Sequence, residues 1–202
     1  MFNLDNFDKD QKELEKAIIL AHKRNELNEQ DWWTINFHAN ALSEKFITRF
    51  RDKFNWTFIT HSPRMYSEQF LIDNFPWLSW STILKHRSIL TTKFIEGVEN
   101  RLNQQQWGDL IRMGLLDENL VRRYKYCVPW EVVCSSMKLS TSFMREMRGF
   151  LNWWEISYYQ MLSVSFMREF RDKIQFQTLV KNGKTHLPKK LQKEFLGEVV
   201  DD

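Results

Sequence analysis

The sequence is poor in the residues that break or cross-link secondary structure. It contains only six Gly, four Pro and two Cys in 202 residues. So few Gly and Pro favour helices joined by short turns. The two cysteines, Cys127 and Cys134, are too few for a disulfide scaffold, and we expect both to be small buried side chains.

Long apolar runs are missing as well. No stretch reaches the ~18 apolar residues of a membrane span. The N-terminus, MFNLDNFDKDQKELEK, is acidic and unlike a signal peptide. We therefore expect a soluble cytosolic protein with no membrane association.

Motifs of catalysis and cofactor binding are also absent. There is no Gly-rich phosphate loop, no HExxH and no GxSxG. His38, His61 and His86 stand about one repeat apart, which places them about a helix diameter from each other, whereas zinc needs its ligands at ~2 Å from one ion. We therefore expect no enzyme, no cofactor and no metal site.

Tryptophan, in contrast, recurs along the chain. Six copies of a repeat begin at Trp32, Trp56, Trp80, Trp107, Trp130 and Trp153, and a faded seventh begins at Phe176. The spacing is 23 or 24 residues, with one of 27. Three positions after each start comes an aliphatic residue: Ile35, Ile59, Ile83, Leu110, Val133, Ile156 and Leu179. Residues three apart share one face of a short helix.

A second helix is expected later in each copy. Its start is indicated by a column of residues that can cap a helix: Ser43, Ser67, Thr91, Asp117, Ser140 and Ser163. Three positions further on stands an apolar column of Phe46, Phe70, Phe94, Leu120, Phe143 and Phe166. Apolar residues follow one and four positions later, except at Asn74 in the second copy. This spacing makes a stripe along a helix of about three turns.

Neither helix could bury its stripe alone, so the copies must stack. The sequence predicts an all-α solenoid of two-helix repeats of 23–24 residues, forming a single elongated domain over residues 1–202. Residues 1–31 form an N-terminal cap, 32–175 the six repeats, and 176–202 a degenerate repeat with a C-terminal cap. The alternative is a helical bundle in which the Trp spacing is accidental.

Three local elements complete this prediction. The N-terminal cap contains a helix from about Lys9 to Arg24, beginning at Asp8 or Asp10. Residues 103–106, Asn-Gln-Gln-Gln, are expected to be a polar loop where the array bends or shifts register. A last helix is expected from Pro188 to Leu196.

The Trp153 copy resembles the tandem repeats W-x-x-I-S-x-x-Q-x-L-S-E-x-F-I-x-x-F-x-D-K-V of uncharacterised bacteriophage and giant-virus proteins. The matching residues are Trp153, Ile156, Ser157, Gln160, Leu162, Ser163, Phe166, Phe170, Asp172 and Lys173. The Trp32 copy keeps the second half of the pattern, from Leu42 to Lys53, whereas Trp80 to Tyr126 match poorly. The resemblance implies a viral protein acting in the host cytoplasm, and it brings no active site.

Two features of the C-terminal half are candidate partner-binding sites. One is a basic ladder formed, if the repeats stack at ~8–10 Å, by Arg122, Lys125, Arg145, Arg148, Arg168 and Arg171. The alternative for it is a solvated face on which Glu146 and Glu169 neutralise neighbouring Arg. The other is Trp154 with Tyr158, large aromatics on a polar helix face, which are typical binding anchors. Its alternative is packing of Trp154 on the C-terminal cap.

These features favour a non-enzymatic viral interaction protein that binds a host macromolecule, such as a host defence protein, and inhibits or redirects it. An acidic protein would fit the basic ladder. The alternative is a nucleic-acid-binding helical repeat protein whose ladder contacts phosphates. The sequence does not indicate an oligomeric state.

Overall fold

The computed structural model describes residues 10–61, 66–182 and 189–197, and in these ranges every regular element is a helix. The chain divides into two compact units, Met1–Arg101 and Leu102–Asp202. The boundary falls at the one 27-residue spacing of the repeat. A single domain over both units stays a prediction.

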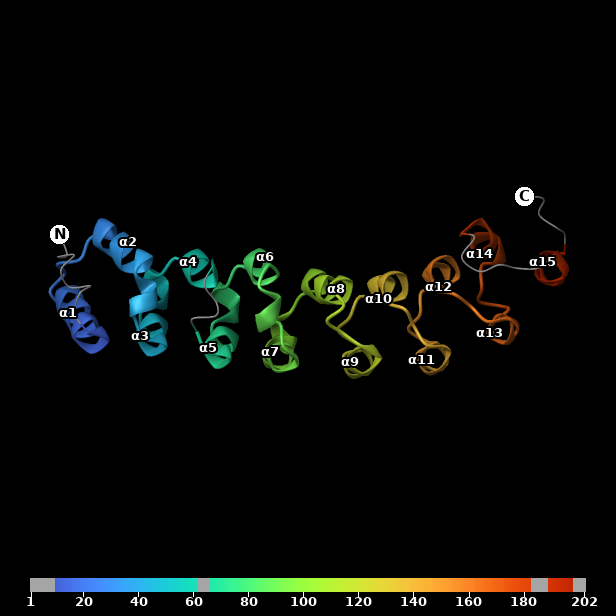
Figure 1. The fold of residues 1–202 in the computed structure, drawn as a ribbon, viewed down its shortest axis with the longest axis horizontal. Coiled ribbons are helices and arrows are strands. Elements are labelled where there is room, and N and C mark those ends of the chain that lie inside the picture. The colour runs from blue at the N-terminus through green and yellow to red at the C-terminus, as the bar shows by residue number, and fades with distance from the viewer. Residues whose placement is uncertain (1–9, 62–65, 183–188, 198–202) are drawn as a thin grey trace. The chain divides into compact units, whose positions relative to one another are not determined.

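In the first unit, helices one repeat apart pack on each other, α4 on α6 and α5 on α7 (Figure 1). Its α-helices are α1 (Gln11–Lys23), α2 (Glu29–Phe37), α3 (Glu44–Arg49), α4 (Trp56–His61), α5 (Glu68–Asp73), α6 (Trp80–Ile83) and α7 (Thr92–Val98). Short 3-10 turns follow several of them, at Ala39–Ala41, Arg51–Lys53, Phe75–Trp77, Arg87–Ile89 and Glu99–Arg101.

In the second unit, the first helices of successive repeats form one row, because α8 packs on α10, α10 on α12 and α12 on α14. The second helices α9, α11 and α13 form another row beside it (Figure 1). The α-helices are α8 (Gln104–Arg112), α9 (Glu118–Arg123), α10 (Trp130–Ser136), α11 (Thr141–Glu146), α12 (Trp153–Tyr159), α13 (Val164–Glu169), α14 (Phe176–Asn182) and α15 (Lys189–Leu196).

The core of each unit consists of the predicted apolar columns. Every residue of the aliphatic column that starts at Ile35 is at most 1 % exposed. The same holds for the column after the Phe: Ile47, Leu71, Ile95, Val121, Met144 and Met167. The Trp column is buried less evenly, since Trp107 is 1 % exposed whereas Trp130 is half-buried. The aliphatic column is therefore the deepest part of the core.

All six predicted caps of the second helices are confirmed. In each repeat the Ser, Thr or Asp side chain accepts a hydrogen bond from the backbone N–H three residues later. Several of these cap residues also donate hydrogen bonds to a glutamate of the preceding repeat. This glutamate directly follows the cap residue of its own repeat. Glu118 accepts from Ser140 N at 2.5 Å and from Ser140 Oγ at 2.8 Å, and Glu44 binds Ser67 in the same way. The Ser-Glu pair of the repeat therefore joins neighbouring second helices.

A second link joins neighbouring first helices. The side chain four positions after the first residue of a repeat accepts a hydrogen bond. The donor is the backbone N–H of the residue just before the next repeat. The link is missing at Ile111, because the residue just before the next repeat is Pro129, which has no backbone N–H. The link is also missing at Leu84, because the residue just before the next repeat is Gln106, whose backbone N–H donates to Asn103 at the start of its own helix. The linked pairs are Asn36 and Asn55, Thr60 and Ser79, Cys134 and Asn152, and Ser157 and Gln175.

Three local predictions are wrong. Residues 103–106 are not a loop, because Asn103 and Gln106 form a capping box that starts α8. The second helices span six or seven residues rather than three turns, since the chain must return to the next Trp within a 23-residue repeat. Cys134 is buried as expected, but Cys127 is exposed in the turn between α9 and α10.

The two terminal helices lie close to their predicted positions. Asp10 caps α1, whereas Asp8 and Pro188 lie outside the described residues. Helix α15 takes the place of the second helix in the seventh repeat, because Phe195 contacts Phe176 at 4.3 Å between ring centroids, as Phe170 contacts Trp153 at 5.0 Å in the repeat before it. The predicted C-terminal cap thus continues the contacts of the repeat.

Candidate interaction surfaces

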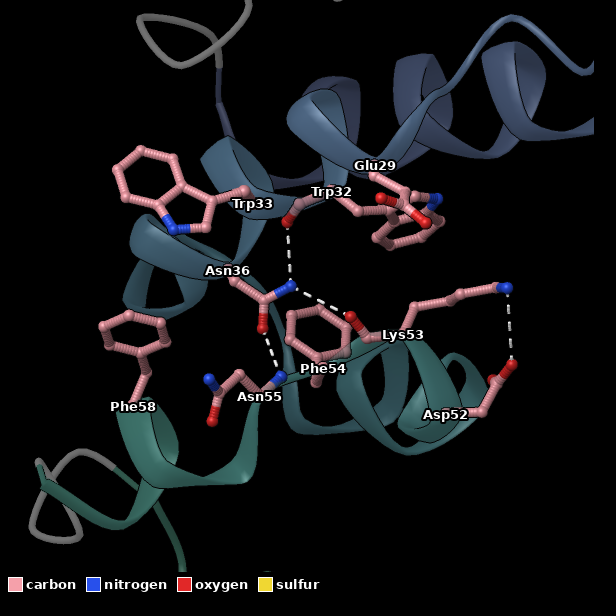
Figure 2. A pocket seen from close by; sticks show the side chains of 9 residues that line it. All are labelled: Glu29, Trp32, Trp33, Asn36, Asp52, Lys53, Phe54, Asn55 and Phe58. Carbon is pink, nitrogen blue, oxygen red and sulfur yellow. Dashed lines mark hydrogen bonds and ion pairs between the residues drawn. The ribbon is translucent and has the colours of Figure 1, made fainter.

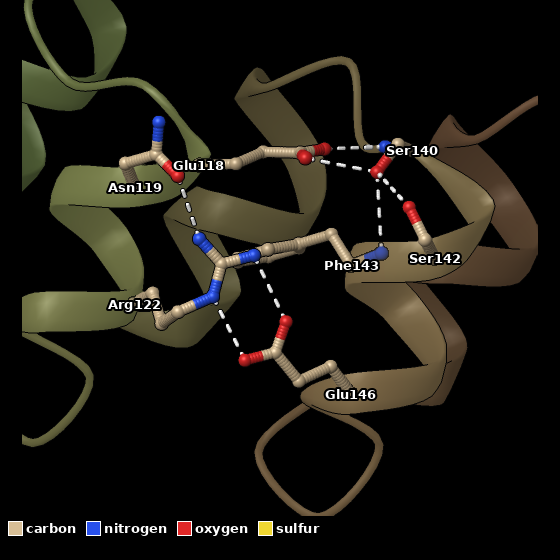
Figure 3. A network of polar contacts seen from close by, with 7 residues as sticks. All are labelled: Glu118, Asn119, Arg122, Ser140, Ser142, Phe143 and Glu146. Atoms are coloured by element: carbon tan, nitrogen blue, oxygen red, sulfur yellow. Dashed lines mark hydrogen bonds and ion pairs between the residues drawn. The ribbon is translucent and has the colours of Figure 1, made fainter.

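One column of the basic ladder consists of Arg122, Arg145 and Arg168, and each of these arginines is bonded to a glutamate further along the chain. Arg122 Nε and Nη2 donate to Glu146 Oε1 and Oε2 at 2.8 and 2.9 Å, and Nη1 donates to Asn119 (Figure 3). Arg145 binds Glu169 with Nε at 2.8 and 3.1 Å. The geometry of Arg122 is the two-bond fork that guanidinium and carboxylate groups form best.

Helix α15 extends this series by one step. Arg168 Nε and Nη2 each donate to Glu194 at 2.9 Å. The guanidinium groups also lie over aromatic rings of the next repeat, with Arg122 5.5 Å from the Phe143 centroid and Arg145 5.8 Å from that of Phe166. Each arginine of this column therefore joins two repeats through one ion pair and, in two cases, one ring face.

The second column of the ladder is held by weaker contacts. Lys125 lies over the rings of Tyr126 and Phe150 at 5.1 and 5.7 Å. Arg148 donates to the Arg145 carbonyl at 3.3 Å, and Arg171 donates to the Glu194 carbonyl at 2.9 Å. These three side chains are the more available half of the predicted surface.

The pKa values reflect the pairing of the first column. Its bonds to Arg122, and then the charge of Lys125, hold the pKa of Glu146 below its usual value. Arg168 does the same for the pKa of Glu194. Because both carboxylates are ionised at neutral pH, they neutralise part of the positive charge of the ladder. This is the behaviour expected if the ladder is a solvated face with paired charges. The role of the ladder in binding stays a prediction.

The predicted aromatic anchor lies on α12. Trp154 is 50 % exposed, and its ring is parallel to that of Tyr158 at 5.4 Å and 3°. Tyr158 also contacts Tyr159 edge-on at 4.8 Å. Trp154 therefore presents its ring to solvent on α12, stacked on the half-buried Tyr158.

A second aromatic surface, on the first unit, is missing from the sequence-based prediction. Trp33 and Phe37 stack on α2 at 5.9 Å and are 55 % and 62 % exposed, and Phe58 of α4 is 40 % exposed. Trp33 and Phe58 line a pocket of about 390 Å³ beside Asn36 and Asn55 (Figure 2). Trp33 and Phe37 lie one and five positions after Trp32, as Trp154 and Tyr158 lie after Trp153. This shared position in the repeat indicates the second aromatic surface from the sequence.

Other kinds of site find no support in the described ranges. Among residues 10–61, 66–182 and 189–197, no three His, Cys, Asp or Glu side chains gather where they could hold a metal ion. None of the described helices is long and apolar enough to cross a bilayer. A scan against protein-family models finds no match, and searches of the curated proteins and of the solved structures find none either.

Proposed function

We propose that this chain is a non-enzymatic helical repeat protein of the solenoid type that binds a protein partner. The observation that carries the proposal is a pair of stacked aromatic rings at the same two repeat positions in two repeats, Trp33 with Phe37 and Trp154 with Tyr158, of which Trp33, Phe37 and Trp154 are exposed and Tyr158 is half-buried. Rigid aromatics bury much area at little entropic cost, which is why Trp and Tyr dominate the binding energy of protein interfaces.

The state of the basic ladder supports a protein partner over a nucleic acid. Phosphate binding draws on free cations, and each neutralised cation removes part of that attraction. Three of the six ladder residues are committed to glutamates, namely Arg122, Arg145 and Arg168. The ladder therefore acts first as a bond between repeats.

The resemblance to phage and giant-virus repeats gives this proposal a biological setting. On that basis the partner is a host macromolecule, such as a defence protein, which the chain inhibits or redirects in the host cytoplasm. Surfaces shared by several repeats suit this task, because stacked repeats present a continuous face to a partner.

The test is affinity capture from host lysate with four forms of the protein. The parent is compared with Trp33→Ala and Trp154→Ala, and with Tyr126→Ala as the control, since Tyr126 is 80 % exposed but lies in a turn outside both aromatic surfaces. We expect nuclease to leave capture unchanged and at least one Trp variant to lose a partner that the control retains.

The opposite results would contradict the proposal. Capture that disappears with nuclease would favour the nucleic-acid alternative, as would oligonucleotide binding that weakens steeply with salt and is lost when Lys125, Arg148 and Arg171 become Gln. Equal capture by all four forms would show that neither aromatic surface contacts a partner.

A further inference from the structure

The pocket of the first unit has aromatic walls from two different helices. Trp33 belongs to α2 and Phe58 to α4, both rings are exposed, and both line the pocket. Its volume of about 390 Å³ is in the size range of ligand pockets. In the pair of repeats that follows Trp154, the position of Phe58 is held by Thr178, which is not aromatic. The first unit therefore offers an exposed Trp together with a facing ring and a pocket.

The side-chain amide oxygens of this pocket are already engaged. Asn36 Oδ1 accepts the backbone N–H of Asn55, and Asn55 Oδ1 accepts that of Thr57 at the start of α4. Asn36 Nδ2 donates to the carbonyls of Trp32 and Lys53 at 2.8 and 2.9 Å. A ligand N–H that entered the pocket would find neither amide oxygen free.

Two donors of the pocket remain available. In residues 10–61, 66–182 and 189–197, neither the Trp33 indole N–H nor the Asn55 Nδ2 group has a hydrogen-bond partner. The indole groups of Trp56 and Trp130, in contrast, donate to backbone carbonyls. An indole N–H can only donate. The aromatic end of the pocket therefore suits a ligand that brings acceptors and no donors.

The other end of the pocket is charged. Figure 2 shows Glu29, Asp52 and Lys53 on the side away from the Trp33 and Phe58 rings. Lys53 pairs with Asp52 at 3.7 Å, whereas Glu29 forms no ion pair within the described part of the chain. This end therefore carries one net negative charge and suits a basic group.

We propose that this pocket binds a proline-rich segment of the protein partner, with proline rings against Trp33 and Phe58 and a basic residue near Glu29. The inference rests on the proposed protein-binding function and names the kind of segment that the partner carries. Aromatic-lined grooves bind such segments well, because the polyproline II helix is already extended and loses little entropy on binding.

Hydrogen bonding favours proline as much as shape does. A polyproline II segment has no internal hydrogen bonds, and proline has no N–H, so the segment offers free carbonyl acceptors and no donors. The Trp33 and Asn55 donors match these carbonyls. An extended segment of other residues would bring one N–H per residue to engaged amide oxygens, and burying an unpaired donor is costly.

The experiment is a titration of the full ¹⁵N-labelled chain with N-acetyl-heptaproline amide, which is uncharged. Binding is followed at the Trp33 indole N–H and at Asn55 Nδ2, whose signals are assigned with Trp33→Phe and Asn55→Asp. We expect a saturable shift of both signals. A Gly-Ser peptide of the same length should bind about tenfold more weakly, because it lacks the rings and the pre-set backbone.

Two variants remove one donor each and preserve the local structure. Trp33→Phe retains a ring, and Asn55→Asp retains the oxygen that caps α4. Each should weaken heptaproline binding about fivefold, as the loss of one hydrogen bond does, without lowering the melting temperature. Trp154→Phe is the matched control, because it removes the indole N–H of the other stack. This variant should bind heptaproline as tightly as the parent.

Flanked peptides test the charged end. A heptaproline with an arginine at each end should bind about fivefold more tightly than one with a glutamate at each end. This difference should become smaller in Glu29→Gln, which removes the unpaired carboxylate. It should also become smaller at high salt, since exposed charges are screened.

Several results would overturn the inference. These are no saturable shift at the Trp33 indole, equal binding of the Gly-Ser peptide, and unchanged binding in both donor variants. An equal loss in Trp33→Phe and Trp154→Phe would also overturn it, as would tighter binding of the glutamate-flanked peptide.

The two proposals fail in different ways. If a captured partner depends on Trp33 but is neither displaced by heptaproline nor lost by Asn55→Asp, the proline-rich segment is wrong and the binding function stands. If the chain binds heptaproline as expected but captures no protein from host lysate, the proposed function falls, and with it the assignment of the segment to a partner.

Discussion

At the scale of single residues, the repeat separates side chains that support the fold from those that meet solvent. The Trp column shows this most clearly. Trp107 is 1 % exposed and packs on Tyr124 at 4.9 Å, whereas Trp154, at the position that follows the column, is 50 % exposed. Two tryptophans thus have opposite roles because of a one-residue difference in helix position.

Trp107→Ala should therefore lower the free energy of unfolding by about 3–5 kcal/mol, as other truncations of buried aromatics do. Trp154→Ala is the control and should change it by no more than about 0.5 kcal/mol. Urea titration followed by circular dichroism measures both. Similar losses in the two variants would show that the exposed ring is part of the core. The same test applies to Trp130→Ala, with a smaller loss expected because Trp130 is half-buried.

At the scale of helices, the elements are too short to be stable alone. The second helices of six or seven residues are far below the length at which an isolated helix persists in water. Their caps and the bonds between repeats compensate for this. Ser140 caps α11 and also donates a hydrogen bond to Glu118 of α9. Ser163 caps α13, but the preceding repeat has Thr141 where the repeat before it has Glu118.

This difference predicts unequal effects of the same substitution. Ser163→Ala should cost about 1 kcal/mol of stability through loss of the cap. Ser140→Ala should cost more, about 1–2 kcal/mol, because the hydroxyl hydrogen bond to Glu118 is lost as well. Thermal melting of the two variants measures the difference. In a Glu118→Gln background, the difference between the stability losses of Ser140→Ala and Ser163→Ala should become smaller. An unchanged difference would show that the Glu118 carboxylate is not its cause.

The Arg-Glu column predicts a dependence on pH. Because the pKa of Glu146 in the folded chain is lowered from its ordinary value of 4.5 by the bonds to Arg122, its contribution to stability is fully present above that value. The contribution is lost as the pH falls through the lowered pKa. Glu146→Gln should therefore reduce the melting temperature at pH 7, and this reduction should shrink as the pH falls below 4.5 and through the lowered pKa.

The control for this prediction is Glu131→Gln, which removes a carboxylate that forms no ion pair in the described residues and should not reduce the melting temperature at pH 7. High salt should also shrink the Glu146→Gln effect, since exposed pairs are screened. If the effect of Glu146→Gln on the melting temperature did not decrease at all as the pH fell below 4.5, packing rather than charge would hold α9 to α11.

At the scale of the whole molecule, the main helix packing among the described residues of each unit joins one repeat to the next. In the second unit α8 packs on α10, α10 on α12 and α12 on α14. Stability in such a structure is close to a sum of repeat and interface contributions, so a local defect spreads over a limited distance.

Hydrogen exchange measured by mass spectrometry can test this within the second unit. Trp107→Ala should increase exchange most in α8 to α10, less in α12, and least in α14. A uniform increase across these helices would show instead that the unit unfolds as a single cooperative body.

The sequence alone was sufficient to determine the helical class, the repeat length, the buried columns and the six capped helix starts. Each of these depends on residues close together in the chain, such as Ser140 and Phe143 in one turn. The start of α8 was also local, but its Asn103–Gln106 capping box went unrecognised among polar residues that are typical of loops.

Only the tertiary structure could decide what the surface residues do. Whether Arg122 is free or bonded depends on the position of Glu146, which lies 24 residues away and comes close only when the repeats stack. The same stacking places Glu131 beside Glu155 and leaves the Trp154 ring in solvent. Local spacing fixes which face of a helix a residue occupies, whereas its charge environment is set by the neighbouring repeat.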